Sequence, residues 1–285
     1  MKRVSAALLL FILAALLATP SSTAGPSAPS FTTIDAPGAG LTMAHGLNNR
    51  GEIAGIYRAG GLGGLSRGFL FFKDAFTTID VPGSPETEPH DINDRGQVVG
   101  VYFAGPFPSP RHGFLMDHGN FTTIDFPNGD HTHALGLNDR GEIVGIYELF
   151  GVLHAFVLDG GNYTTLDVPG ASRTDAYDIN NRGQIVGIYQ TAGVFHGFLL
   201  EDDVFTTIDV PGATQTFVTS INDRGQLCGV YELGGVEHGF IRDENGITTI
   251  DGPGASTTEV LAINNRGEVA GYYIAAGIYH AFIRR

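Results

Sequence analysis

The chain repeats one motif six times, and this repetition is the feature that most limits how it can fold. A five-residue segment of aromatic or aliphatic residue, Thr, Thr, Ile or Leu, Asp recurs at intervals of 45, 45, 42, 42 and 42 residues. The segments start at Phe31, Phe76, Phe121, Tyr163, Phe205 and Ile247. An Asn follows each start at the same distance in every copy, at Asn48, Asn93, Asn138, Asn180, Asn222 and Asn264. A repeat of this length is one supersecondary unit that buries its apolar faces only against its neighbours.

Each of these Asn residues opens the sequence Asn-(Asp or Asn)-Arg-Gly between two apolar runs, as in the segment 93–96. Asn at the first position and Gly at the fourth suit a type I turn that ends in a left-handed glycine. The Asn and Gly are therefore predicted to form hairpin tips. The pattern then predicts four short strands per copy, which are an inner strand before the Asn, a second strand after it, a third strand and an outer Thr-Thr-Ile-Asp strand.

Two further positions recur in the motif. The second strand carries a glycine at its centre, for which we expect an aromatic side chain of a neighbouring strand or repeat to lie close by. These glycines are Gly55, Gly100, Gly145, Gly187, Gly229 and Gly271. The third strand starts with a His in five copies, and a local hydrogen bond is predicted for each. These residues are His112, His154, His196, His238 and His280, with Arg67 in the first copy.

Four antiparallel strands in one short repeat favour a β-propeller over a solenoid. The sequence predicts an all-β, six-bladed β-propeller of four-stranded antiparallel blades, forming a single domain over residues 31–285. The chain starts with a lone outer strand at 31–35 and ends with a copy that lacks one. We therefore expect the N-terminal strand to complete the last blade and so close the ring, because an open array would expose a sheet edge.

The repeat resembles a known family. Asn-Asp-Arg-Gly-x-(Ile/Val)-Val-Gly-x-Tyr followed by His-Ala-Phe, present at His154-Ala155-Phe156 and His280-Ala281-Phe282, is similar to the extracellular HAF-repeat family. The likeness spans the whole chain after the first residues. It implies a secreted bacterial protein of propeller type, and it brings no activity for particular residues. Arg67 and the His-Gly-Phe copies depart mildly from the motif.

The N-terminus indicates export. Lys2 and Arg3 precede an apolar run from Val4 to Ala18, and Ser22-Thr23-Ala24 offers a small-residue cleavage site. We predict a signal peptide at 1–24, a linker at 25–30, and a secreted, extracellular or periplasmic protein that is not inserted in a membrane after cleavage. Cleavage leaves 14 basic against 30 acidic residues, a net charge of −16. Nucleic acid is therefore not an expected partner.

Function is expected where the copies differ, because residues shared by all copies are explained by the fold. The start of the inner strand, five residues before each Asn, varies most in chemistry. Nearby residues that we predict to bind a ligand are Glu88, His90, His131, His133, Asp175 and Glu259. The long loops at 58–66 and 103–110 offer a second place for a site. A metal or acid-base site built from Glu88, His131, His133 and Asp175 is conceivable, but no catalytic residue, metal ligand or cofactor is assigned.

Two functions stay open at this point. The first is a non-enzymatic binding or scaffold module, acting as a monomer, for a glycan, a peptide or another envelope protein at the channel mouth. The alternative is a lyase or hydrolase that acts there on a sugar-containing or lactone substrate. Structural calcium in the acidic loops is a third reading, although no Asp-x-Asp-x-Asp loop supports it. The single cysteine, Cys228, replaces Val or Ala of other copies and is predicted to be buried.

Overall fold

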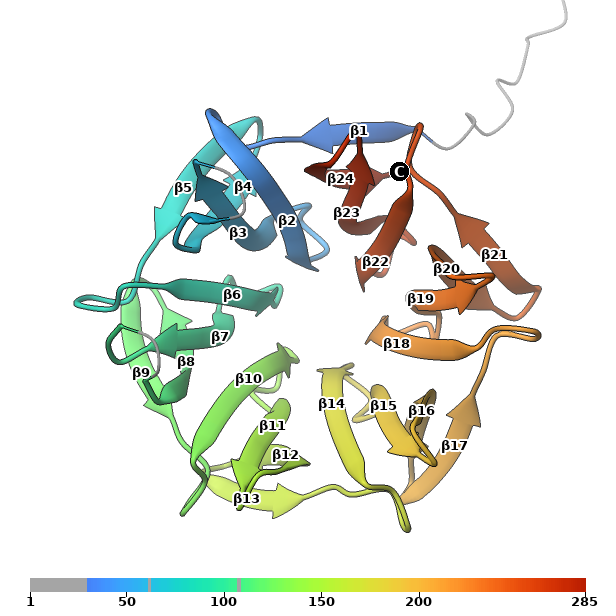
Figure 1. Ribbon diagram of the computed structural model, residues 1–285. Helices are drawn as coiled ribbons and strands as arrows, with labels where there is room; N and C mark the ends of the chain where they lie inside the picture. The colour runs from blue at the N-terminus through green and yellow to red at the C-terminus, as the bar shows by residue number, and fades with distance from the viewer. Residues whose placement is uncertain (1–29, 61–62, 107–108) are drawn as a thin grey trace, which may run out of the picture.

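A computed structural model describes residues 30–285 except 61–62 and 107–108, and these residues form 24 strands around a central axis (Figure 1). The predicted signal peptide, residues 25–29 of the predicted linker and parts of the two long loops lie outside the described residues. Within the described part of the chain, no helix is long and apolar enough to cross a membrane.

Four strands per repeat follow one another from the axis to the rim, and β1 (Phe31–Ile34) from the N-terminal end is the outer strand of the last repeat. The inner strands are β2 (Ala39–Leu47), β6 (Thr87–Ile92), β10 (His131–Leu137), β14 (Arg173–Ile179), β18 (Gln215–Ile221) and β22 (Thr257–Ile263). The second strands are β3 (Ile53–Ala59), β7 (Val98–Phe103), β11 (Ile143–Leu149), β15 (Ile185–Thr191), β19 (Leu227–Leu233) and β23 (Val269–Ala275).

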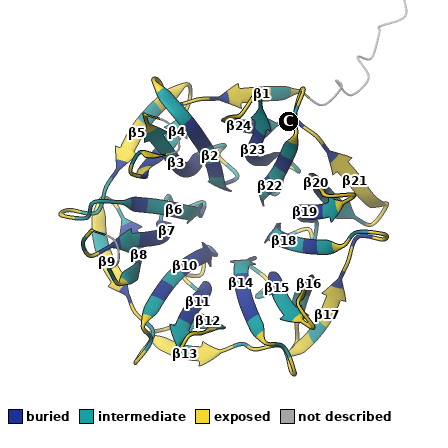
Figure 2. Ribbon diagram, viewed as in Figure 1, coloured by how far each residue is buried: buried dark blue, intermediate teal, exposed yellow. Residues whose placement is uncertain are grey.

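The third and outer strands complete the repeats. The third strands are β4 (Arg67–Phe72), β8 (Arg111–Asp117), β12 (Val152–Asp159), β16 (Val194–Glu201), β20 (Val236–Asp243) and β24 (Ile278–Arg284). The outer strands are β5 (Ala75–Ile79), β9 (Asn120–Ile124), β13 (Asn162–Thr165), β17 (Val204–Ile208), β21 (Gly246–Ile250) and β1 (Phe31–Ile34). Figure 2 shows that the outer strands are the most exposed.

The predicted division into six separate four-stranded blades is wrong. Hydrogen bonding gives four separate four-stranded blades, β6–β9, β10–β13, β14–β17 and β18–β21, and one sheet of eight strands. The eight-stranded sheet joins the strands of the first repeat, β2–β5, to β22–β24 and β1, because β2 forms a parallel bridge to β24 at Leu41 and Tyr279. The inner strand β2 starts earlier in its repeat than the others do and carries an extra register shift between Ala39 and Leu41. This longer start brings its backbone within bonding reach of β24.

The two ends of the described chain lie side by side. Strand β1 pairs antiparallel with β24 from Phe31↔Arg284 to Ile34↔Ala281. The outer strand position of the last repeat is therefore filled from the N-terminal end, as the repeat pattern requires, and the edge of β24 is covered.

The core lies between neighbouring sheets. The largest fully buried side chains are the third-strand phenylalanines Phe69, Phe114, Phe156, Phe198, Phe240 and Phe282. In five repeats the ring of this residue lies against the central glycine of the second strand, where an added Cβ would meet it at 2.8–3.0 Å. The prediction of a close aromatic at these glycines is confirmed there. Cys228 is buried, as predicted.

The predicted hairpin tips and local histidine bonds are confirmed. Each Asn carbonyl accepts a hydrogen bond from the amide of the turn Gly, as from Gly96 to Asn93 at 3.0 Å, and Gly96 has a φ of 80°. Each of the five motif histidines bonds the Asp that lies just after the adjacent outer strand, as in His196 Nδ1 to Asp209 Oδ2 at 2.9 Å. These pairs belong to the fold, because every one occupies the same place in its repeat.

We expect removal of β1 to destabilise the protein and expose an adhesive edge. A variant that starts after Asp35 should unfold at a lower temperature and scatter light in a concentration-dependent way, because β24 then presents unpaired backbone groups. Asp35→Ala is the matched control, since it keeps β1 and loses only the exposed pair with His280, worth about 0–1 kcal/mol. Equal behaviour of the truncated and control proteins would contradict this role of β1.

Candidate functional site

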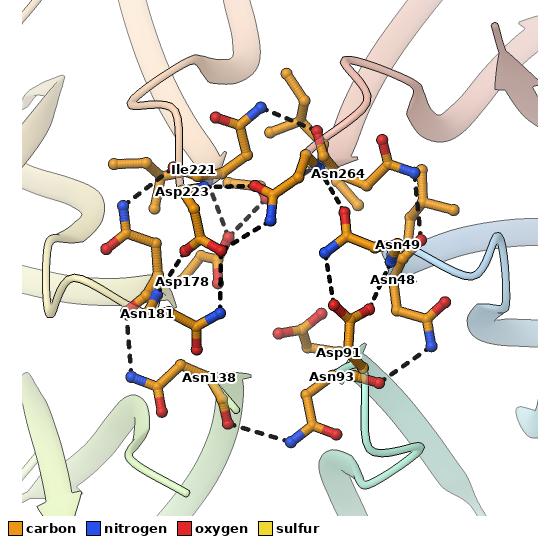
Figure 3. Close-up of a pocket in the computed structure, with 18 of the residues that line it drawn as sticks. Asn48, Asn49, Asp91, Asn93, Asn138, Asp178, Asn181, Ile221, Asp223 and Asn264 are labelled. Carbon is orange, nitrogen blue, oxygen red and sulfur yellow. Dashed lines mark hydrogen bonds between the residues drawn. The ribbon is translucent and has the colours of Figure 1, made fainter. Parts of the chain in front are cut away.

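One end of the central axis is closed by a ring of asparagines. The Nδ2 group of each turn Asn donates to the backbone carbonyl of the turn Asn in the next repeat, at 2.9–3.2 Å, and the last bond runs from Asn264 back to Asn48 (Figure 3). The Oδ1 atom of each Asn meanwhile accepts two amides of its own turn, as Asn180 does from Arg182 and Gln184. The side chain that caps each hairpin therefore also ties it to its neighbour.

A second ring lies beside the first. The residue after each turn Asn donates its backbone amide to the side-chain oxygen of the equivalent residue in the next repeat, at 2.6–2.9 Å. These residues are Asn49, Asp94, Asp139, Asn181, Asp223 and Asn265. The space left at this end is small, about 80 Å³. Because the polar groups of the two rings hydrogen-bond one another, we assign these rings to the scaffold.

A β-bulge interrupts every inner strand. The pairing register shifts three residues before each turn Asn, for example between Ala176 and Asp178. A bulge re-aims the side chain of the extra residue, and all six bulged residues line one cavity. They are His45, His90, Leu135, Tyr177, Thr219 and Leu261. Apart from His45 and His90, neighbouring repeats carry different residue types at the bulge, although the turn that follows the bulge is constant.

The cavity has a volume of about 420 Å³, within the range of about 300–1,000 Å³ typical of small-molecule sites. Besides the bulged residues, its lining consists of Asp91, Asp178, Phe217, Ser220, Val230, Glu237, Glu259 and Ala262. It contains carboxyl groups, imidazoles, hydroxyls and aromatic faces, and its lining includes no Lys or Arg.

Two buried carboxyl groups, Asp91 and Asp178, form part of this lining. Asp178 accepts hydrogen bonds from the Ile179 and Ile221 amides and the Ser220 hydroxyl, at 2.6–2.9 Å. Burial raises the pKa of Asp178 to about 6, against the lowering effect of these bonds. Burial and then the charge of Asp178 raise the pKa of Asp91 well above its ordinary value. Both groups also link neighbouring repeats, since Asp91 accepts from the Leu137 amide at 3.0 Å.

Burial disfavours the protonated form of the histidines in and beside the cavity. The rings of His45 and His90 stack at a centroid distance of 5.1 Å, and His45 Nδ1 bonds the Pro89 carbonyl at 2.9 Å. Burial lowers the pKa of both, and for His90 the neighbouring His45 and His133 lower it further. Burial also lowers the pKa of His133 to about 4, with Arg111 adding to the effect.

The structure brings only some of the sequence-predicted site residues together. His90 and Glu259 line the cavity. Glu88 instead faces Arg58 at 3.9 Å, and Asp175, which is fully buried, is held by the Arg173 guanidinium at 2.8 and 2.5 Å.

The remaining two predicted residues lie outside the cavity lining. His131 Nδ1 accepts the Arg111 amide at 3.0 Å, and His133 is close enough to His90 to lower its pKa. Among the described residues, no group of three or more His, Cys, Asp or Glu has a metal-binding arrangement, so the conceivable metal site that included these two histidines is not assembled.

The sequence pattern missed residues near the bulge. In a regular strand, successive side chains point to opposite faces, so adjacent residues such as Tyr177 and Asp178 would not both face the cavity. The bulge places both there, and the same holds for Asp91 beside His90. A bulge cannot be read from the alternation of the sequence. One signal was available. The position two residues before the turn Asn is Gly or Ala in three repeats and Asp or Ser in the others, an irregularity beside an otherwise constant turn.

We predict that Asp178 makes stability fall as pH rises from about 4 to about 6. An unfolded Asp titrates near about 3.9, and the folded value is about 6, so over this window the unfolded chain has released a proton that the folded chain keeps. The buried histidines act oppositely, since their lowered pKa makes stability grow up to about pH 6.5.

Asp178→Asn isolates the first effect. The free energy of unfolding of the wild type minus that of the variant should decrease between pH about 4 and about 6, measured by urea denaturation at each pH. Asp203→Asn, in an exposed turn, is the control and should give a flat difference. A flat or rising difference for Asp178→Asn would refute the assignment.

The chain matches no protein-family model, and no curated protein matches it in sequence. Solved structures resemble it in fold. A putative TolB from Agrobacterium tumefaciens has a TM-score of 0.58 at 13% identity over 86% of this chain and 90% of that chain. A streptogramin B lyase has a TM-score of 0.54 at 10% identity, over 90% of this chain and 98% of that one.

The β-propeller domain of the Trilobed protease from Pyrococcus furiosus is also similar, with a TM-score of 0.51 at 11% identity over 86% of this chain and 81% of that chain. At such identities the likeness concerns the fold alone, and proteins with different functions share it. The chain is thus a β-propeller module.

Proposed function

We propose that the protein is a secreted, non-enzymatic binding module whose ligand occupies the central cavity. The observation that carries the proposal is the bulge position. The six bulged side chains line one cavity of about 420 Å³ and differ along the ring, while the turn beside them is constant. A rigid frame with a variable lining is the arrangement expected of a binding site.

The lining indicates what kind of ligand fits. The cavity combines apolar faces, such as Phe217 and Leu261, with hydroxyl, imidazole and carboxyl groups, and its lining has no Lys or Arg. An anionic group would find no counter-charge there. Of the ligands expected from the sequence, a glycan residue or a peptide side chain suits the enclosed space better than a flat protein surface does.

Secretion is part of the proposal. It rests on the predicted signal peptide at 1–24 and on the resemblance to extracellular HAF-repeat proteins. The acidic surface, with a net charge of −14 for the full chain, argues against nucleic acid as a partner.

An enzyme is the second candidate, and one observation favours it. Asp91, Asp178, His45 and His90 share one cavity, and titrating groups with shifted pKa values cluster at catalytic sites. A lyase or hydrolase with a sugar-containing or lactone substrate would use such groups. We rank it second because both carboxyl groups already accept backbone amides that hold neighbouring repeats together.

We predict that filling the cavity abolishes ligand binding. Leu261→Trp places a larger side chain in the cavity, so compounds that stabilise the wild type should no longer raise the melting temperature of the variant. A ligand present at 100 times its Kd stabilises the folded wild type by about 2.7 kcal/mol. The measurement is a thermal-shift screen of soluble oligosaccharides, short peptides and small metabolites. Val204→Trp, on an exposed outer strand, is the matched control.

Two results would count against the proposal. If hits bind Leu261→Trp as well as they bind the wild type, the ligand sits elsewhere. If a hit is converted to product, and Asp178→Asn stops conversion but keeps binding, the protein is an enzyme.

A further inference from the structure

Two carboxylates line one wall of the cavity, and a tyrosine found in one repeat bonds one of them. At the inner-strand position of Glu259, the other repeats have Met43, Glu88, His133, Asp175 and Phe217. Tyr272 replaces the aliphatic residue that the other repeats carry on the second strand, and Glu237 is the second residue of β20, the third strand of the neighbouring repeat. Glu259 and Glu237 line the cavity, and the Tyr272 hydroxyl donates to Glu259 Oε1.

The ring provides its own comparison for Glu259. The other two carboxylates at this strand position each face an arginine, Glu88 with Arg58 and Asp175 with Arg173. Among the described residues, Glu259 has a hydrogen bond only from Tyr272 and no basic partner. The guanidinium that balances the charge elsewhere in the ring is therefore missing at the one such carboxylate that lines the cavity.

A second carboxylate adds to the negative charge that has no basic partner on this wall within the described ranges of the chain. Glu237 lies at the cavity margin and is exposed, and in the described part of the chain its side chain takes part in no hydrogen bond or ion pair. It is close enough that its charge, after burial, helps to raise the pKa of Glu259. Two carboxylates repel each other without a cation between them, and Asp91 and Asp178 lie further along the same lining.

Aromatic faces complete the wall. Phe217 lines the cavity from the neighbouring inner strand, and Phe195 supports its ring at a centroid distance of 5.4 Å. Tyr177 lines the cavity beyond it. Carboxylates beside aromatic faces, with no basic residue in the lining, are complementary to an ammonium group, which is attracted by both the charge and the ring.

We propose that this wall, formed by Glu237, Glu259 and Phe217, binds the ammonium group of a small organic cation. The ligand cation takes the place that arginine has beside Glu88 and Asp175. This inference rests on the proposed function and adds to it the chemical class of the ligand. A neutral sugar, held by hydroxyl bonds to the same carboxylates, is the competing outcome.

The test uses choline and benzylammonium as probes, each compared with a neutral analogue. The analogues are the alcohol in which carbon replaces the choline nitrogen, and benzyl alcohol. Binding to the whole protein is followed by titration calorimetry and ligand-observed NMR. We expect each ammonium to bind at least about tenfold more tightly than its analogue, since a desolvated cation–π contact is worth about 2 kcal/mol, and to bind more weakly as salt is added.

Variants locate the contact. Glu259→Gln and Glu237→Gln should each weaken ammonium binding, Glu259→Gln by about tenfold or more, while leaving the neutral analogues unaffected. Glu88→Gln is the matched control, because it removes a carboxylate at the same strand position from a pair outside the cavity lining. Thermal unfolding of each variant checks that it is folded.

The inference is overturned if neither ammonium binds, if the analogues bind as tightly, or if Glu259→Gln binds the probes like the wild type. The proposed function is still supported in these cases if neutral sugars or other neutral compounds bind the wild type and do not bind Leu261→Trp. If Leu261→Trp leaves every ligand bound, the cavity itself is not the site and both proposals fail.

Discussion

The hydrogen bonds of the turn asparagines are the interaction on which the rest of the structure depends. Each Asn is nearly fully buried and has two tasks, to cap its own hairpin through Oδ1 and to reach the next hairpin through Nδ2. Because the last bond returns to the first repeat, the ring has no free end. Within the described chain, loss of one Nδ2 donor would leave the carbonyl of the next repeat with only the bond from its own turn Gly, and would remove the side-chain link between the two hairpins.

This ring sets where a ligand can and cannot bind. It fills one end of the axis with side chains that satisfy one another, so that little space remains there. The bulge three residues earlier then turns one side chain per repeat toward the axis, beyond the ring. The scaffold and the cavity lining are thus separate positions of one short segment, and the lining can vary in chemistry without disturbing the turn.

The acidic groups around the axis also differ in their tasks. Asp91 and Asp178 bridge neighbouring repeats and are held by backbone amides, and the buried Asp175 pairs with the partly exposed Arg173. Such groups mainly serve the fold, since a buried charge is tolerated only when it is paired or hydrogen-bonded. Glu237 and Glu259 lack a basic partner among the described residues and face the cavity, which is why they carry the argument about the ligand.

The sequence by itself determined the strands, the hairpin tips and the meeting of the two chain ends, because a period with fixed Asn and Gly encodes local turn geometry in every copy. It also pointed to His90 and Glu259. Only the tertiary structure decided that the first and last repeats share one eight-stranded sheet, since the bridge between Leu41 and Tyr279 depends on how far β2 extends across the ring. The same holds for the cavity. Strand pairing and the packing of repeats decide whether Glu259 has an arginine beside it, and they also decide which side chain a bulge turns inward. A local sequence pattern contains neither kind of information.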